Sequence, residues 1–178
     1  MEVNNLTKTF TIENYLADDS PFKIGIRLDE QNERGILAIG VNGKDVYKIQ
    51  PDLQVAEHQS YALSCRPLMY LDWLYANLEH LMVPDHDIER PGIDYIKNLK
   101  QEDVRKYIRV TGKHLMLPDM LHHQPLFFLK DDDSIEISWD SSEQGLFFYE
   151  RGIEIVPAGL FEQKVNEVLK SHGYDSKL

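Results

Sequence analysis

The spacing of the apolar residues changes twice along this chain, and this change constrains the fold more than any other sequence feature. Residues 22–29 read FKIGIRLD, in which apolar side chains alternate as in a half-buried strand. Further on, RPLMYLDWLYANLEHLMVP places leucines three and four residues apart, which is typical of a helix with one buried face. The last third returns to strand-like runs. Strand runs on both sides of helical runs, without strict strand–helix alternation, predict an α+β fold.

Turn and cap residues predict where the first elements begin and end. Asn42-Gly43 separates two β-prone runs and is the strongest short hairpin signal, because both turn positions need positive φ. SYALSCRP predicts a further strand that ends before Pro67. That proline suits the first turn of the leucine-rich helix, with Ser64 as a possible cap and Pro84 as the exit signal.

The rest of the chain predicts more helices and two strand pairs. A helical stretch covers residues 92–111 and is interrupted near Lys100, where KQED offers a new N-terminal signal. One hairpin is expected around the three aspartates that follow Lys130, and another strand pair around Arg151-Gly152. The last stretch predicts a helix that ends before Gly173, with a buried face of Phe161, Val165, Val168 and Leu169.

These elements predict one α+β domain over residues 1–178, with antiparallel sheets built from the N-terminal and C-terminal hairpins. The chain is β-rich over 1–64 and helical over 65–113, and the hairpins and terminal helix occupy 114–178. A central helical segment and the terminal helix pack on the sheets. Cys65 is the only cysteine, which excludes a disulfide framework. Without a secretion signal or an apolar run of the ~20 residues that a bilayer needs, we expect a cytoplasmic protein and no membrane contact.

Charge is distributed unevenly along the chain. The net charge is −11, and residues 125–178 carry eleven acids against five bases, whereas 90–113 carry seven bases against three acids. An acidic surface can steer a basic partner protein. We therefore predict a surface with acidic rim contacts and buried aromatic anchors, since tryptophan and tyrosine dominate interface hot spots. The rim is assigned to Asp131, Asp132, Asp133, Glu136 and Glu154, and the anchors to Trp139, Phe148 and Tyr149.

The segment HLMLPDMLHHQP contains residue types that bind zinc: His114, Asp119, His122 and His123. Their spacing does not favour a site. The segment has no HExxH motif, Pro118 prevents one regular helix, and adjacent histidines in a strand point to opposite faces. We expect structural or surface histidines here, and no metal or other cofactor.

Two further regions are candidate binding sites. On the leucine-rich helix, a possible ligand face comprises Arg66, Trp73 and Asn77, although such a pair of tryptophan and amide is more often structural. The basic stretch 97–113 is a possible nucleic-acid contact through Lys97, Lys100, Arg105, Lys106 and Arg109. The negative total charge disfavours that contact, because phosphate affinity depends on lysine and arginine.

Motifs of common enzymes are missing from the sequence. GxxxxGK[ST], GxGxxG and GxSxG do not occur, so neither a phosphate-binding loop nor a nucleophile elbow is predicted. The PD-(D/E)xK nuclease pattern fails because Phe128 stands where a second metal-binding carboxylate is needed. An enzyme is therefore the less favoured class.

Three stretches together resemble a module of uncharacterised bacterial proteins: LPDMLHHQPLFFLKDDDSIEISWD, then FFYERGIEIVPAGLFEQKVNEVLKSHG, and upstream RPLMYLDWLYANLEHL. That module occurs near or fused to ImmA/IrrE-type metallopeptidase domains and in toxin–immunity and defence loci. This chain has no HExxH, so the resemblance implies a recognition or immunity-type module rather than a peptidase. The matching residues have no known catalytic role: Trp73, Asn77, Pro118, Asp119, Ser138 and Trp139.

The favoured function is a non-enzymatic, acidic protein-interaction module that binds a basic partner. An immunity protein, an antitoxin or a subunit of a bacterial defence system would fit this description. Two alternatives stay open: a metal-dependent hydrolase that uses the histidine-rich segment, and a nucleic-acid-binding accessory protein that uses the basic stretch.

Overall fold

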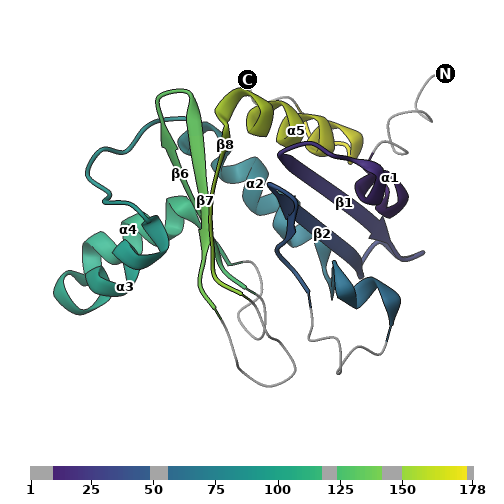
Figure 1. The fold of residues 1–178 in the computed structure, drawn as a ribbon, viewed down its shortest axis with the longest axis horizontal. Helices are drawn as coiled ribbons and strands as arrows, with labels where there is room; N and C mark the ends of the chain where they lie inside the picture. The colour runs from purple at the N-terminus through teal and green to yellow at the C-terminus, as the bar shows by residue number, and fades with distance from the viewer. Residues whose placement is uncertain (1–9, 49–55, 118–123, 142–149, 176–178) are drawn as a thin grey trace.

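The structure is a computed structural model that describes residues 10–48, 56–117, 124–141 and 150–175 (Figure 1). It confirms the α+β class, with helices and two antiparallel sheets. The helices are α1 (Ile12–Ala17), the 3-10 helix η3 (Glu57–Ser60), α2 (Pro67–Leu81), α3 (Gly92–Glu102), α4 (Val104–His114) and α5 (Ala158–Ser171). The strands are β1 (Phe22–Leu28), β2 (Gly35–Val41), β3 (Lys44–Asp45), β4 (Leu63–Cys65), β5 (Leu115–Met116), β6 (Leu126–Asp131), β7 (Ser134–Trp139) and β8 (Gly152–Pro157).

The first sheet is organised around β2, which pairs antiparallel with β1, β3 and β4. The turn between β2 and β3 confirms the predicted hairpin, with φ of 49° at Asn42 and 79° at Gly43. The predicted strand before Pro67 is β4. Ser64 lies within that strand, so the prediction that it caps the next helix is wrong.

The central helices follow the sequence pattern. Pro67 is at the start of α2, and the leucines of the stripe are buried. The break near Lys100 is confirmed, because α3 ends at Glu102 and α4 begins at Val104. The Asp103 carboxylate accepts a hydrogen bond from the Lys106 backbone N–H at 3.0 Å and so caps α4.

The second sheet has the order β5-β6-β7-β8, with antiparallel pairs throughout. β6 and β7 form the predicted hairpin around the three aspartates, and Asp132 takes a positive φ in its turn. Of the strand pair predicted around Arg151-Gly152, only β8 lies within the described residues. The predicted terminal helix is α5, and Gly173 after it has a φ of 87°.

The second sheet has helices on both faces (Figure 1). Its inner face, toward α2 and α5, shares one apolar core with the first sheet. Phe161 of α5 joins the two sheets, since its ring contacts Phe22 of β1 (4.9 Å between centroids) and Phe128 of β6 (5.5 Å). The outer face packs against α3 and α4 through a second apolar cluster that includes Phe127 and Leu129. Within the described residues, no helix is both long and apolar enough to cross a bilayer.

Candidate interaction surface

The outer face of the second sheet holds an unusual pair of neighbours. Glu136 and Ser138 of β7 point to this face, and their cross-strand partners on β8 are Ile155 and Ile153. The polar residues are buried, with Glu136 only 1% exposed, whereas Ile153 and Ile155 are 44% and 53% exposed. Polar and apolar side chains have therefore exchanged their usual places on adjacent strands.

Glu136 and Ser138 are buried because they bind the start of α3. The Gly92 N–H donates to Glu136 Oε1 (2.8 Å), and the Ile93 N–H donates to Ser138 Oγ (3.2 Å). The Ser138 hydroxyl donates in turn to Glu136 Oε1 (2.8 Å). The first N–H groups of a helix have no partner within it, and the preceding Pro91 provides no side-chain cap, so β7 caps α3.

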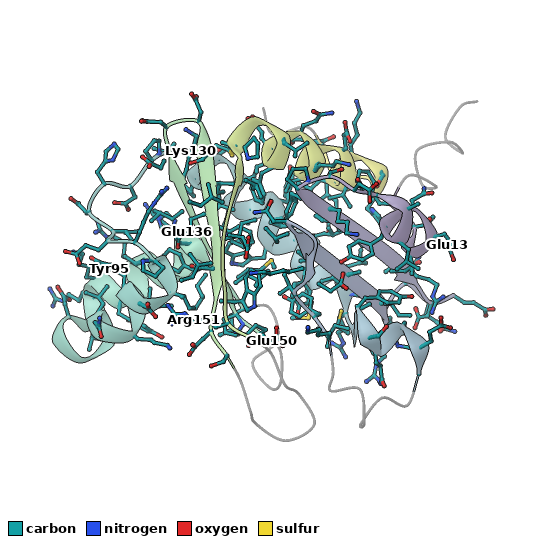
Figure 2. The ribbon with its side chains drawn as sticks, viewed as in Figure 1. Glu13, Tyr95, Lys130, Glu136, Glu150 and Arg151 are labelled. Carbon is teal, nitrogen blue, oxygen red and sulfur yellow. The ribbon has the colours of Figure 1, made fainter. Side chains whose placement is uncertain are left out.

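This arrangement corrects the prediction for Glu136. The predicted rim residue is inside the protein, between the sheet and α3 (Figure 2), and holds the helix rather than a partner. Arg90 lies beside it, with Nε at 3.8 Å from Glu136 Oε2 and Nη1 at 3.3 Å from Asp131 Oδ2. Gly92 completes the contact, since a Cβ at that position would lie 2.2 Å from the buried Phe127 ring.

Trp139 is also buried and is not available as a partner anchor. It points to the inner face with Ile135 and Ile137, is 3% exposed, and donates its indole N–H to the Glu150 carbonyl (2.7 Å). Gly152 lies against the indole ring. The other two predicted anchors, Phe148 and Tyr149, lie outside the described residues.

β8 is the edge strand, and its outer face is open because α3 packs on β6 and β7. At the start of β8, the Arg151 guanidinium donates to both carboxylate oxygens of Asp94 on α3, with Nη1 at 2.8 Å from Oδ1. These hydrogen bonds lower the pKa of Asp94. Ile153 and Ile155 follow this ion pair along the strand.

Glu154, between the two isoleucines, points to the inner face. Its carboxylate pairs with Lys44 and accepts a hydrogen bond from Asn42 Nδ2 (3.0 Å), and the same amide donates to the Ile155 carbonyl (3.1 Å). The β2–β3 turn thus binds β8. Glu154 was predicted as a rim residue, but its side chain is 13% exposed and contacts the first sheet.

The acidic turn between β6 and β7 lies next to the end of β8. The Ala158 N–H donates to the Asp133 carbonyl (2.9 Å), and Ser134 is the cross-strand partner of Pro157. Asp132 and Asp133 are exposed. We use the name β8 surface for Ile153 and Ile155 on the strand together with Asp132 and Asp133 in the turn next to its end.

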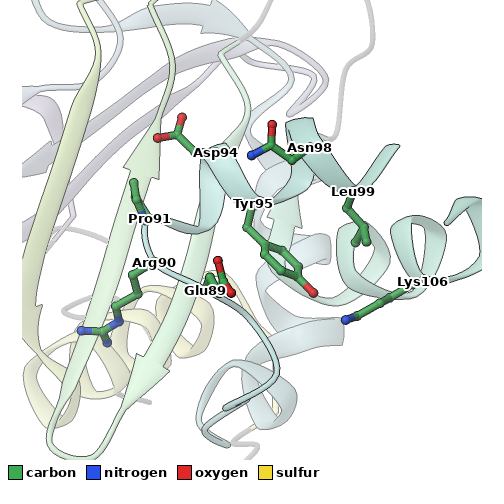
Figure 3. Close-up of a pocket in the computed structure, with 8 residues that line it drawn as sticks. All are labelled: Glu89, Arg90, Pro91, Asp94, Tyr95, Asn98, Leu99 and Lys106. Atoms are coloured by element: carbon green, nitrogen blue, oxygen red, sulfur yellow. The ribbon is translucent and has the colours of Figure 1, made fainter. Parts of the chain in front are cut away.

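A pocket of about 340 Å³ lies between α3, α4 and the loop before α3 (Figure 3). Arg90 points out of it toward the strands, and Asp94 is bound to Arg151. The Lys106 ammonium lies 5.4 Å from the centre of the Tyr95 ring. The pocket is a polar gap where α3 and α4 meet, with several of its charged groups in contacts within the protein. Its lining consists of Glu89, Arg90, Pro91, Asp94, Tyr95, Asn98, Leu99 and Lys106.

The predicted ligand face on α2 is largely occupied by contacts within the protein. Asn77 Nδ2 donates to the Trp73 carbonyl (2.9 Å), and the Trp73 ring packs on Phe128 at 5.9 Å between centroids. Arg66 is exposed at the start of the helix. Trp73 and Asn77 therefore have the structural roles that are usual for these residue types.

The histidine-rich segment begins with a buried structural histidine. His114 Nδ1 donates to the Phe128 carbonyl (3.0 Å), and its ring stacks on Phe127. Nε2 lies 3.6 Å from an Asp85 carboxylate oxygen, and burial lowers the pKa of His114. Asp119, His122 and His123 lie outside the described residues. Among the residues that are described, no three metal-binding side chains form a cluster.

The basic stretch does not form one uniform surface. Lys97 pairs with Asp140, and Lys106 lies over the Tyr95 ring. Arg105 and Arg109 are exposed on α4, and they alternate with two exposed apolar residues, Val104 and Ile108. The side chain of Lys100 is not among those described.

Comparison of the chain with family models, with curated proteins and with solved structures gave no match. The resemblance to the bacterial recognition module therefore stays a prediction, and the function has to be argued from the surface itself.

Proposed function

We propose that this chain is a protein-interaction module that binds a basic partner protein through the β8 surface. The observation that carries the proposal is the exposure of Ile153 and Ile155, side by side on the outer face of the edge strand. Single exposed apolar residues are common, but neighbouring ones rimmed by polar residues are typical of interaction sites. Sequence reasoning missed both isoleucines, because IEIV predicts them on the buried face.

The β8 surface combines a source of affinity with a source of selectivity. Burying the exposed part of an isoleucine yields about 1 kcal/mol, from about 25 cal/mol per Å² of apolar area. Asp132 and Asp133 are exposed in the turn next to the end of β8, and such charges select a basic partner and accelerate its approach. This keeps the predicted acidic rim at the turn and replaces the predicted aromatic anchors by isoleucines.

We infer that the partner contacts side chains rather than adding a strand to the sheet. Backbone groups of alternate residues in an antiparallel edge strand point away from the sheet. The Ile155 carbonyl is one of these, and it accepts a hydrogen bond from Asn42. Pro157, two residues later, has no N–H to donate. Both features protect a sheet edge from another strand.

The resemblance to the bacterial module favours an immunity protein, an antitoxin or a defence subunit as the specific role. The two alternatives have less support. Nucleic-acid binding depends on contacts between phosphates and basic side chains, and the exposed Val104 and Ile108 that lie between the arginines of α4 cannot contribute to such contacts. For hydrolysis, the described part of the histidine-rich segment offers only His114, whose Nδ1 is engaged by the Phe128 carbonyl.

The test is affinity capture from the cytoplasm of the native host, at low and high salt, with mass spectrometry. The wild type should retain one stoichiometric partner that is released as salt rises. The Ile153→Thr/Ile155→Thr variant should lose it, and Asp133→Asn should hold it less tightly. Leu16→Thr, an exposed apolar residue on α1, is the matched control and should behave as wild type. Equal capture by all four proteins would exclude the β8 surface as the binding site.

A further inference from the structure

The exposed face of α4 is a second apolar surface, of opposite charge. Val104 and Ile108 lie one helical turn apart and are 64% and 63% exposed. Arg105 and Arg109 repeat the same spacing beside them. The opposite side of the helix, with Val110 and His114, is buried. We call these four exposed residues the α4 surface.

The two arginines of the α4 surface are available to a partner. Within the part of the chain that the structure describes, neither forms an ion pair, whereas Lys97 and Arg90 are paired with carboxylates. α4 lies with α3 on the far side of the second sheet from the first sheet (Figure 1). An apolar pair with two cations beside it is complementary to an apolar pair with exposed carboxylates at one end.

That complement is present on the same molecule. The β8 surface has Ile153 and Ile155 exposed on the strand, and Asp132 and Asp133 exposed in the turn next to its end. We propose that a second copy of this chain docks its α4 surface on the β8 surface of the first. This inference rests on the proposed function, because it uses the same β8 surface and takes the arginine-bearing α4 surface of a second copy as the basic surface that it binds.

Such a contact joins two different surfaces, so it is head-to-tail rather than a symmetric dimer contact. An open assembly leaves one α4 surface and one β8 surface free at its ends, so copies add until the assembly closes into a ring or continues as a filament. The net charge of −11 repels copies at long range, but at physiological ionic strength charges more than ~8 Å apart are largely screened. Local complementarity then dominates over the total charge.

Sedimentation velocity of the full chain tests the proposal with two variants that each remove one surface. Arg105→Glu/Ile108→Glu removes the α4 surface, and Asp133→Lys/Ile155→Lys removes the β8 surface. The wild type should form assemblies larger than a dimer as its concentration rises, and each variant alone should stay monomeric. An equimolar mixture should form 1:1 dimers and nothing larger, because only one intact contact is possible.

Circular dichroism establishes that both variants are folded before they are mixed. A wild type that stays monomeric up to millimolar concentration, or a mixture that stays monomeric, overturns the inference. If the wild type is monomeric but its captured partner is lost in Ile153→Thr/Ile155→Thr, the proposed function stands and self-association fails. Binding of a labelled oligonucleotide that is lost in the α4 variant would assign the α4 surface to nucleic acid instead.

Discussion

β7 and β8 are neighbouring strands on the same face of one sheet, and they treat polar and apolar residues in opposite ways. On β7 the carboxylate of Glu136 is buried, and on β8 its cross-strand partner Ile155 is 53% exposed. The difference follows from what covers each strand. α3 packs on β7 and needs acceptors for its first N–H groups, whereas the outer face of β8 is not covered by this helix. Burial here is determined by hydrogen-bonding demand and by coverage, rather than by the polarity of the residue.

Removing the buried carboxylate of Glu136 should have the largest effect on the stability of the protein. Glu136→Ala leaves the Gly92 N–H without its acceptor and the Ser138 hydroxyl without its own. An unsatisfied buried donor costs 1–3 kcal/mol, so we expect the free energy of unfolding to fall by about 3 kcal/mol. Urea denaturation followed by circular dichroism measures it. Ile155→Thr on the partner strand is the control, and an equal loss there would contradict the comparison.

Adding a methyl group under α3 should have the next largest effect. The Cβ of Gly92→Ala would lie 2.2 Å from the Phe127 ring, which is completely buried and has little room to move. Overpacking of this kind costs about 2 kcal/mol. The matched control is Gly112→Ala in α4, where the new Cβ meets no atom within 4 Å. It should stabilise the protein by about 0.5–1 kcal/mol through helix propensity, and thermal denaturation of both variants decides the sign.

Most elements could be predicted from the sequence, because their signals are local. The alternation in β1, the Asn42-Gly43 turn, the leucine stripe of α2 and the Asp103 cap each depend on a few consecutive residues. The fold class followed from their order. The Ser64 cap failed because the same serine also fits the strand that precedes the helix.

The site could be predicted less well, because it depends on coverage by distant segments. Trp139 alternates with Ile135 and Ile137, so the strand pattern already indicated that it points inward with them. A signal also existed for Glu136: Pro91 cannot cap α3 with a side chain, so another segment has to do so. The exposure of Ile153 and Ile155 could not be predicted from the local sequence, because IEIV is equally typical of a strand whose apolar face is covered by another element.

The stability of the protein should depend on pH through His114, which lies at the end of α4 and contacts β6. Burial lowers the pKa of His114 below its usual 6.5, so the unfolded chain binds a proton that the folded protein excludes. The free energy of unfolding should therefore decrease as pH falls below 6.5 and level off once the folded pKa is passed. Denaturation at pH 7.5 and 5.5 measures this loss. His114→Gln should reduce it, whereas His80→Gln, an exposed histidine of α2, should leave it unchanged.

The smallest change in stability is expected for substitutions of the two exposed isoleucines of β8. Ile153→Thr/Ile155→Thr keeps the β-branched shape and replaces an ethyl group by a hydroxyl in side chains that are about half exposed, so the free energy of unfolding should change by less than about 0.5 kcal/mol. Ile137→Thr, on the inner face of β7, buries an extra hydroxyl in the core and should cost about 2 kcal/mol. A loss above about 1 kcal/mol for the β8 pair would mean that folding already covers these isoleucines. The β8 surface would then be closed to any partner, since one side chain cannot stabilise the core and bind a second protein with the same area.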